Sequence, residues 1–163
     1  MNEHDFGDLA RRDTERHLLA AVDESANSKR AVMFLADFFS DSQNVFVTLL
    51  SIIPEPSEDF FPTEAERRPW LQAKEAEMQK HLTGYKEILL GAGFSDARIA
   101  TRLSIRPGTI SVGDAILEEQ EKLRCCIVVV GRRGISHSEE FVFGSTSSKI
   151  LHHAKHCAVM VVE

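Results

Sequence analysis

The chain has 163 residues, which is enough for one domain whose hydrophobic core needs no disulfide. Its composition, 43% hydrophobic and 27% charged, is that of an ordinary globular protein and excludes disordered and fibrous classes. The net charge of −6 argues against a general nucleic-acid partner, because such proteins neutralise phosphates with clustered Lys and Arg. No apolar run approaches the ~18 residues that cross a bilayer, and residues 1–16 lack the apolar segment of a secretory signal, so we expect a cytoplasmic protein.

The first half of the chain alternates between strand and helix patterns. Residues 18–22 form a short apolar run typical of a buried strand, and the polar cluster 23–28 predicts a loop and a helix N-cap. The helix that follows should bury one stripe, made of Ala31, Val32, Leu35, Phe38 and Phe39. Residues 45–53 are apolar and β-rich, as in a central strand covered on both faces. For residues 54–69, which carry prolines and acids, we expect an irregular excursion.

The second half continues this alternation. A long amphipathic helix, with a stripe at Leu71, Met78, Leu82, Tyr85 and Leu89, should end near residues 91–93. Residues 99–105 alternate between apolar and polar types, which favours a strand at the edge of a sheet. The remaining predicted elements are a helix with a buried stripe at Val112, Ala115, Ile116 and Leu123, a strand at 126–130, a helix at 145–154 and a strand at 158–162.

Strands that alternate with helices favour a parallel sheet with helices on both faces, because crossover connections are right-handed. The predicted fold class is therefore doubly wound α/β. No internal repeat or second core is visible, so we expect a polar N-terminal tail at 1–14 and one domain at 15–163.

The loop after the fourth predicted strand has the composition of a phosphate site. It runs from Gly131-Arg132-Arg133-Gly134 through nine residues to Gly144-Ser145-Thr146, which opens a helix. Ligands of doubly wound sheets bind at the carboxyl ends of the strands. Glycines let the backbone approach an oxygen closely, and the N–H groups at a helix start attract anions. The alternative is that these glycines only form a tight turn.

These residues resemble the universal stress protein family, whose nucleotide-binding members carry G-x2-G-x9-G-[ST] after the fourth strand. The turn Val22-Asp23-Glu24-Ser25 is similar to the family's V-D-x-S, and the strand ending at Gly131 is similar to its apolar fourth strand. The resemblance covers about residues 16–163. Cys126 and Ala158 depart from it, since the family usually has Asp and Pro there.

The resemblance implies a five-stranded sheet in the order 3-2-1-4-5, of the adenine-nucleotide α-hydrolase-like kind, with ATP across the tips of strands one, two and four. Asp23 would lie by the ribose or by a Mg²⁺ or Mn²⁺ ion on the phosphates, although an Asp after a strand is commonly just a turn or N-cap residue. The main chain around Leu50 or Ser51 would hold the adenine edge. The residues implied to line the ribose and phosphates are Val130, Gly131, Gly134, Gly144, Ser145 and Thr146.

Three functions are open at this point. The favoured one is an ATP-dependent stress-response or signalling module with slow hydrolysis at most, because no P-loop lysine and no carboxylate pair for metals is evident. The second is an adenine-nucleotide α-hydrolase or adenylate-transferring enzyme, which would be expected to carry S-G-G-x-D-S after strand one, where this chain has the glycine-free segment 23–28. The third is a dimeric scaffold without nucleotide.

The last predicted strand, residues 158–162, is apolar throughout and lacks the Lys or Pro that protects a sheet edge, so we predict a homodimer built on it. Cys125 and Cys126 point to opposite faces of a strand and should be reduced, buried thiols rather than a bridge. The cluster His152, His153, His156 and Cys157 has one helical i,i+4 pair but no evident fourth ligand, so a metal site is disfavoured. Phe60, Phe61 and Trp70 are assigned to packing.

Overall fold

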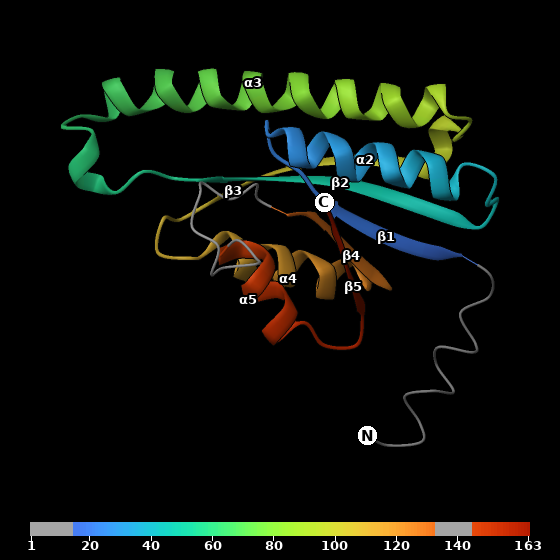
Figure 1. Cartoon of the computed structure of the whole chain (residues 1–163). Coiled ribbons are helices and arrows are strands. Elements are labelled where there is room, and N and C mark those ends of the chain that lie inside the picture. The colour runs from blue at the N-terminus through green and yellow to red at the C-terminus, as the bar shows by residue number, and fades with distance from the viewer. Residues whose placement is uncertain (1–14, 133–144) are drawn as a thin grey trace.

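The computed structural model describes residues 15–132 and 145–163, in which five parallel strands form one sheet in the order β3-β2-β1-β4-β5 (Figure 1). The strands are β1 (Arg16–Ala21), β2 (Val45–Pro54), β3 (Ile99–Arg106), β4 (Ile127–Gly131) and β5 (Ala158–Val162). The helices are α2 (Ala26–Phe39), α3 (Glu64–Gly91), α4 (Val112–Leu123) and α5 (Ser145–His153), with short 3₁₀ turns η1 (Glu58–Phe60) and η2 (Asp96–Arg98). The predicted doubly wound α/β fold and strand order are confirmed.

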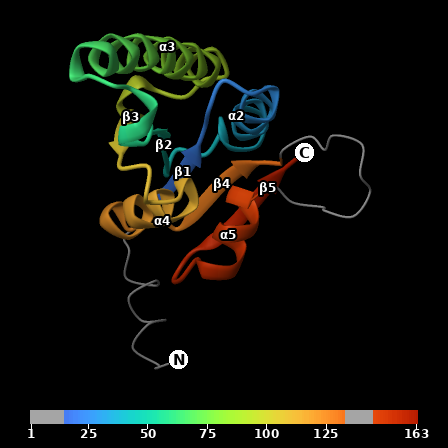
Figure 2. The same cartoon turned by 90° about the vertical axis from the view of Figure 1, so that its left-hand side faces the viewer.

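The helices cover both faces of the sheet. In Figures 1 and 2, α2 and α3 lie on one face and α4 and α5 on the other. Two hydrophobic clusters fill these layers: one packs α2 and α3 residues such as Leu35 and Leu82 on the sheet, and the other packs Ile116 and Ile150 of α4 and α5. The three inner strands contribute to both clusters, which explains why their sequences are almost wholly apolar.

Helix α2 differs from its predicted stripe at one position. Val32 and Leu35 are fully buried, but Phe38 is 64% exposed, and Ala36 is buried instead. Phe38 stacks on Phe34 with ring centroids 4.5 Å apart. Phe34, in turn, is partly buried and packs against the hydrophobic cluster beneath α2 and α3, so Phe38 extends this cluster outwards rather than entering it.

Helix α3 begins earlier than predicted, at Glu64, so Pro69 lies inside it and the irregular excursion ends sooner. Proline removes one backbone donor and crowds the preceding turn, but here both effects fall within the first two turns. The predicted stripe from Met78 to Leu89 is buried, and the helix ends at Gly91, followed by Gly93 with a φ of 109°. None of the helices in the described ranges has the length and hydropathy needed to span a bilayer.

Candidate functional site

A cavity of about 260 Å³ lies at the carboxyl ends of β1, β2 and β4, the place where doubly wound folds bind ligands. Its polar rim comes from the β1–α2 turn and the start of α5, and its floor comes from apolar strand and helix residues. The lining residues are Ala21, Val22, Asp23, Glu24, Ser25, Asn27, Ser28, Leu50, Ile52, Ile53, Pro54, Lys74, Met78, Val112, Ile116, Val130, Gly131, Thr146 and Ser147.

The turn between β1 and α2 is fixed by its own side chains. The Oδ1 atom of Asp23 accepts hydrogen bonds from the backbone N–H of Ser25 at 3.0 Å and from the Oγ–H of Ser28 at 2.7 Å. Ser25 is the N-cap of α2 and accepts from the Ser28 N–H at 3.2 Å. The loop and N-cap predicted from this sequence are therefore present, and Asp23 both shapes the turn and lines the cavity.

Helix α3 holds the other side of this turn. The Tyr85 hydroxyl donates to the Asp23 carbonyl at 2.6 Å, and burial, with the nearby acids Asp23 and Glu24, raises the pKa of Tyr85. At the mouth, the Nζ of Lys74 lies 3.0 Å from Glu77 and 3.4 Å from Glu24, and these carboxylates raise the pKa of Lys74. A cation from α3 therefore stands at the rim.

Strand β2 presents main-chain groups to the cavity just beyond the end of β1. The β1–β2 register ends at the pair Ala21 and Leu50, and the Val22 N–H makes one more bond, to the Leu50 carbonyl at 2.8 Å. Main-chain groups along a strand point alternately to its two neighbours. Those of Ile52 therefore point in the same direction as those of Leu50, into the space beyond the end of β1. Ile52 lines the cavity.

The neighbouring Ser51 does not line the cavity. Its main-chain groups face β3, because those of its neighbour Leu50 face β1 and the direction alternates along the strand, and its side chain is 1% exposed. The Ser51 hydroxyl donates to the Val22 carbonyl at 2.8 Å, a bond that fastens the end of β1 to β2. Ser51 thus supports the site from behind.

Gly131, at the end of β4, is in contact with the first turn of α2. A Cβ added there would lie 2.7 Å from the carbonyl carbon and oxygen of Asn27 and 2.9 Å from its Cβ. The φ of Gly131 is not in the left-handed region, so close approach of two backbones, rather than conformational freedom, requires this glycine. This contact sets the spacing between the two sides of the cavity.

The start of α5 closes the cavity on the β4 side. Thr146 and Ser147 line it, whereas Ser145 is exposed and does not. The helix is held by α4: Gly113 lies so close to Lys149 that an added Cβ would be 2.8 Å from its Cγ, and the Lys149 Nζ pairs with Asp114 at 3.3 Å. Residues from the first turns of α2, α4 and α5 therefore line one cavity.

Of the residues predicted for the site, the structure brings together around this cavity Asp23, Leu50, Val130, Gly131 and Thr146. Gly134 and Gly144 lie outside the described residues. The prediction did not name Ile52 or Ser147. Ser147 follows the motif's Gly-Ser-Thr directly and faces inward with 3% exposure, but only the phase of the helix shows which hydroxyl does so.

The other chemistry-bearing residues lie apart from the cavity. Nδ1 of His152 is 2.8 Å from the carbonyl of Ser148, one helical turn earlier, and His156 lies at the turn before β5. Within residues 15–132 and 145–163, no three His, Cys, Asp or Glu residues gather as metal ligands. Phe60 is 67% exposed and contacts Phe61, so the packing role expected for it is partial.

Several known structures share this fold. Universal stress protein UspA from Lactobacillus plantarum is 18% identical with a TM-score of 0.73, covering 93% of this chain and 100% of its own. The universal stress protein from Archaeoglobus fulgidus, in complex with dAMP, is 19% identical with a TM-score of 0.65 over 92% and 99%. A universal stress protein family protein from Arabidopsis thaliana, with AMP bound, is 20% identical with a TM-score of 0.61 over 90% of each chain.

No curated protein matches the sequence of this chain. The sequence model of the universal stress protein family, in contrast, matches residues 15–163, which includes all five strands and every residue that lines the cavity. The chain therefore belongs to the universal stress protein family.

Proposed function

We propose that this protein binds ATP in the cavity at the carboxyl ends of β1, β2 and β4 and acts as a nucleotide-dependent stress-response or signalling module. The observation that carries the proposal is the convergence of three groups on one cavity: the Asp23 turn, the main chain of Ile52 and the start of α5 at Thr146. The adenine nucleotides bound by the Archaeoglobus and Arabidopsis proteins, which share the fold, support it.

The size and lining of the cavity suit a nucleoside. At about 260 Å³ it is slightly smaller than the roughly 300–1,000 Å³ of typical ligand pockets, so a base and ribose fill it and the phosphates extend over the rim. Apolar side chains such as Ile53 and Met78 offer packing surfaces to a base. The phosphates would then meet the N-terminus of α5 at Thr146, where backbone N–H groups and the helix dipole favour an anion.

The main chain of Ile52 supplies one donor and one acceptor side by side. Adenine offers the complementary pair on its Watson–Crick edge, an acceptor at N1 and a donor at N6. In this proposal the Ile52 peptide takes the place that the sequence had suggested for Leu50 or Ser51, because the Leu50 carbonyl already accepts from Val22 and Ser51 faces β3. Asp23 would accept a hydrogen bond from the ribose or hold a phosphate-bound Mg²⁺ or Mn²⁺.

Binding is better supported than turnover. Among residues 15–132 and 145–163, the carboxylates that line the cavity are those of Asp23 and Glu24; Asp23 is used in the turn and Glu24 pairs with Lys74. A hydrolase would need a general base and fixed metal ligands near the phosphates. We therefore propose slow hydrolysis at most, and the release of AMP or pyrophosphate at a catalytic rate would favour the enzyme alternative.

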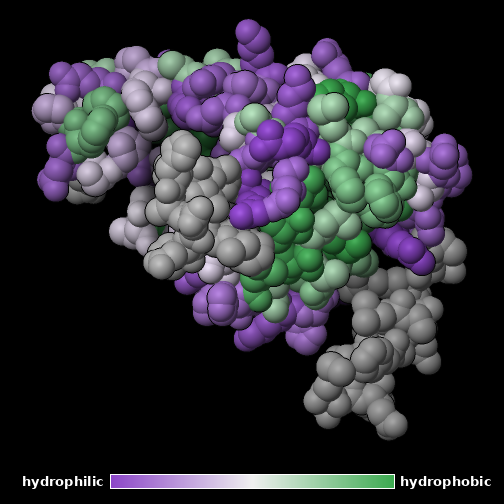
Figure 3. Space-filling model, in the orientation of Figure 1, coloured by the Kyte–Doolittle hydropathy of each residue, from purple (hydrophilic) through white to green (hydrophobic). Residues whose placement is uncertain are grey.

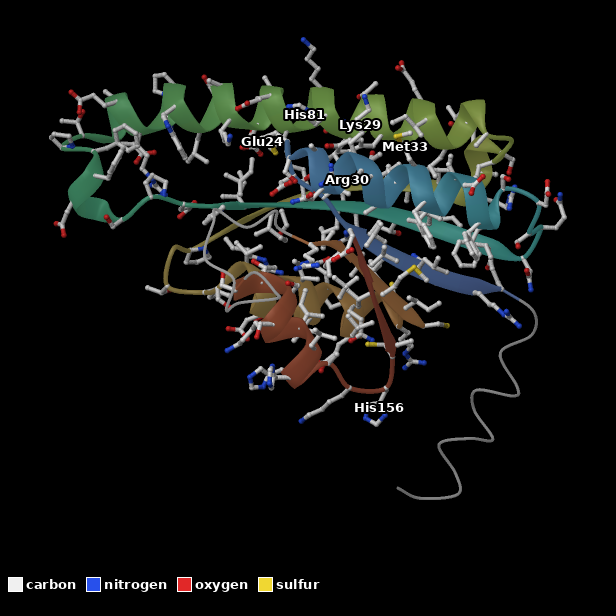
Figure 4. All side chains as sticks on the ribbon, in the orientation of Figure 1. Glu24, Lys29, Arg30, Met33, His81 and His156 are labelled. Carbon is white, nitrogen blue, oxygen red and sulfur yellow. The ribbon has the colours of Figure 1, made fainter. Side chains whose placement is uncertain are left out.

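The proposal includes a homodimer through β5. This strand pairs only with β4 within the described residues, and its central side chains are half-buried although all are apolar. Figure 3 shows hydrophobic residues gathered over α2 and β5, and Figure 4 shows Met33 on this helix. Met33 and Phe38 are 52% and 64% exposed. Two β5 strands paired about a two-fold axis would satisfy the free edge and cover this surface.

Mass spectrometry of freshly purified, denatured protein tests the nucleotide directly. We expect recovery of an adenine nucleotide, or calorimetric binding of added ATP in preference to GTP by the emptied protein.

Asp23→Asn keeps an Oδ1 acceptor for Ser25 and Ser28 but removes the charge, and we expect at least a fivefold loss of ATP affinity. Asp37→Asn, an exposed acid of α2 outside the cavity, is the matched control and should bind like the parent. No binding of ATP by the folded parent protein would favour the scaffold alternative.

A further inference from the structure

Two cysteines lie opposite each other on neighbouring strands, at the end of the sheet remote from the cavity. Ile127 pairs with Ala158 at the start of β4 and β5, so Cys126 and Cys157, one residue earlier on each chain segment, are the next pair in register. The Ala158 N–H donates to the Cys126 carbonyl at 2.9 Å, which holds the two segments at sheet spacing there.

Both side chains point to the same face of the sheet. Val128 and Val159 pack in the cluster beneath α4 and α5, and Cys157 packs with them. By the two-residue period of a strand, Cys126 shares this face with Val128. The buried Cys125 belongs to the same cluster, so the prediction that the two adjacent cysteines point to opposite faces is wrong; regular strand β4 begins only at Ile127. Burial, together with the neighbouring Cys126 thiol, raises the pKa of Cys157, in agreement with this arrangement.

The distance suits a covalent bond between them. Neighbouring strands are about 4.7–4.9 Å apart, and disulfides join Cα atoms that are about 4.4–6.8 Å apart. Arg124, two residues before Cys126, and His156, directly before Cys157, have left-handed backbone with φ of 51° and 57°, so both segments leave the regular ladder shortly before the pair. Figure 4 labels His156 at this turn.

We infer that Cys126 and Cys157 form a dithiol site that reacts with small-molecule disulfides to give an intramolecular disulfide between β4 and β5. Both thiols are partly exposed, whereas Cys125 is 1% exposed and therefore protected. From the sequence alone, we considered only a bridge between the adjacent Cys125 and Cys126 and rejected it. The partner that the fold provides for Cys126 lies 31 positions further along the chain.

The reaction is a two-step thiol–disulfide exchange. The thiolate of one cysteine attacks a sulfur of oxidised glutathione, which forms a mixed disulfide and releases one glutathione thiolate. The second cysteine then loses its proton and attacks the protein sulfur of the mixed disulfide, which releases the second glutathione. The protein loses two electrons and two protons, and oxidised glutathione gains both.

The bond would enclose the segment that forms the β4 side of the cavity. Gly131, Thr146 and Ser147 all lie between the two cysteines in the chain. Closing residues 126–157 into a loop removes conformations from the unfolded chain, so the oxidised protein should unfold at a higher temperature, by on the order of 5–10 °C. The site does not depend on the proposed nucleotide function.

The test treats the reduced, folded protein with oxidised glutathione, alkylates the remaining thiols and maps the peptides by mass spectrometry without reduction. We expect the number of thiols to fall from three to one, with a Cys126–Cys157 peptide and the rise in melting temperature. Cys125→Ser should form the same bond. Cys126→Ser and Cys157→Ser should stop at a single glutathione adduct and show no such rise.

Three results would overturn the inference: three unreacted thiols in the parent protein, a bridge that includes Cys125, or a bond between two chains in place of the internal one. Because the parent protein alone decides among these results, the conclusion survives if a serine variant fails to fold. Binding of ATP by the parent is measured separately, so failure of the dithiol site and failure of the nucleotide proposal are distinguishable.

Discussion

Replacement of Gly131 by alanine tests how tightly β4 and α2 approach each other. The added Cβ would lie 2.7 Å from two backbone atoms of Asn27 and 2.9 Å from its Cβ, and no flexible side-chain end is available to move aside. Overpacking of this kind costs about 1–3 kcal/mol. For a domain of this size, each kcal/mol lowers the melting temperature by roughly 2–4 °C, so we expect a decrease of about 2–12 °C.

Gly84→Ala is the matched control, because the same methyl group meets nothing within 4 Å there. Gly84 lies inside α3, where alanine is favoured over glycine by about 1 kcal/mol, so this variant should melt roughly 2–4 °C above the parent. Thermal unfolding followed by circular dichroism, with urea titration for the free energy of unfolding, measures both. If Gly131→Ala is as stable as the parent protein, the close approach does not constrain the site and the reasoning fails.

Three further predictions concern variants of Glu119, Asp23 and Val161. Glu119 is 3% exposed; burial alone would raise its pKa, but Lys122, Arg102 and Arg106 together hold it below its usual value. Its ionised form therefore stabilises the fold above the unfolded pKa of about 4.3, and this contribution is lost as pH falls through the lower folded pKa. Glu119→Gln should cost about 1–3 kcal/mol at pH 7 and progressively less towards pH 3, as urea unfolding measures; a cost independent of pH would contradict this. The ATP affinity of Asp23→Asn should fall further with Mg²⁺ than with EDTA, and an equal calorimetric loss would instead favour a hydrogen bond to the nucleoside. Val161→Lys, on half-buried β5, should convert a homodimer into monomers in light scattering at micromolar concentration, and a parent protein that is already monomeric there would refute the dimer.

The sequence predicted the elements well because burial leaves a periodic trace in it. The inner strands are almost wholly apolar since helices cover both of their faces, and the polar cluster 23–28 predicted an N-cap, which the structure places at Ser25. The exceptions have local causes. Phe38 was placed in the stripe of α2 but stacks on the outside of Phe34 and stays exposed, and α3 tolerates Pro69 close to its start.

The side of the sheet that carries the cavity was also predictable, because Asp23, Gly131 and Thr146 all follow or end strands, and parallel strands end together. Which main-chain groups face the cavity was not. Ser51 and Ile52 are adjacent in one strand, and the sequence does not show which of them has its main chain turned towards the cavity. The point at which β1 ends beside β2 decides that it is Ile52.

The sequence by itself thus determined the order of strands and helices, the family and the end of the sheet that carries the cavity, since these depend on local periodicity and on a motif of fixed spacing. The tertiary structure alone decided which distant residues meet. It placed Gly131 against Asn27 and Cys126 opposite Cys157. The physical reason is that strand register and helix phase are set by the packing of the whole core. This packing depends on residues far apart in the chain, so no short stretch of sequence determines it.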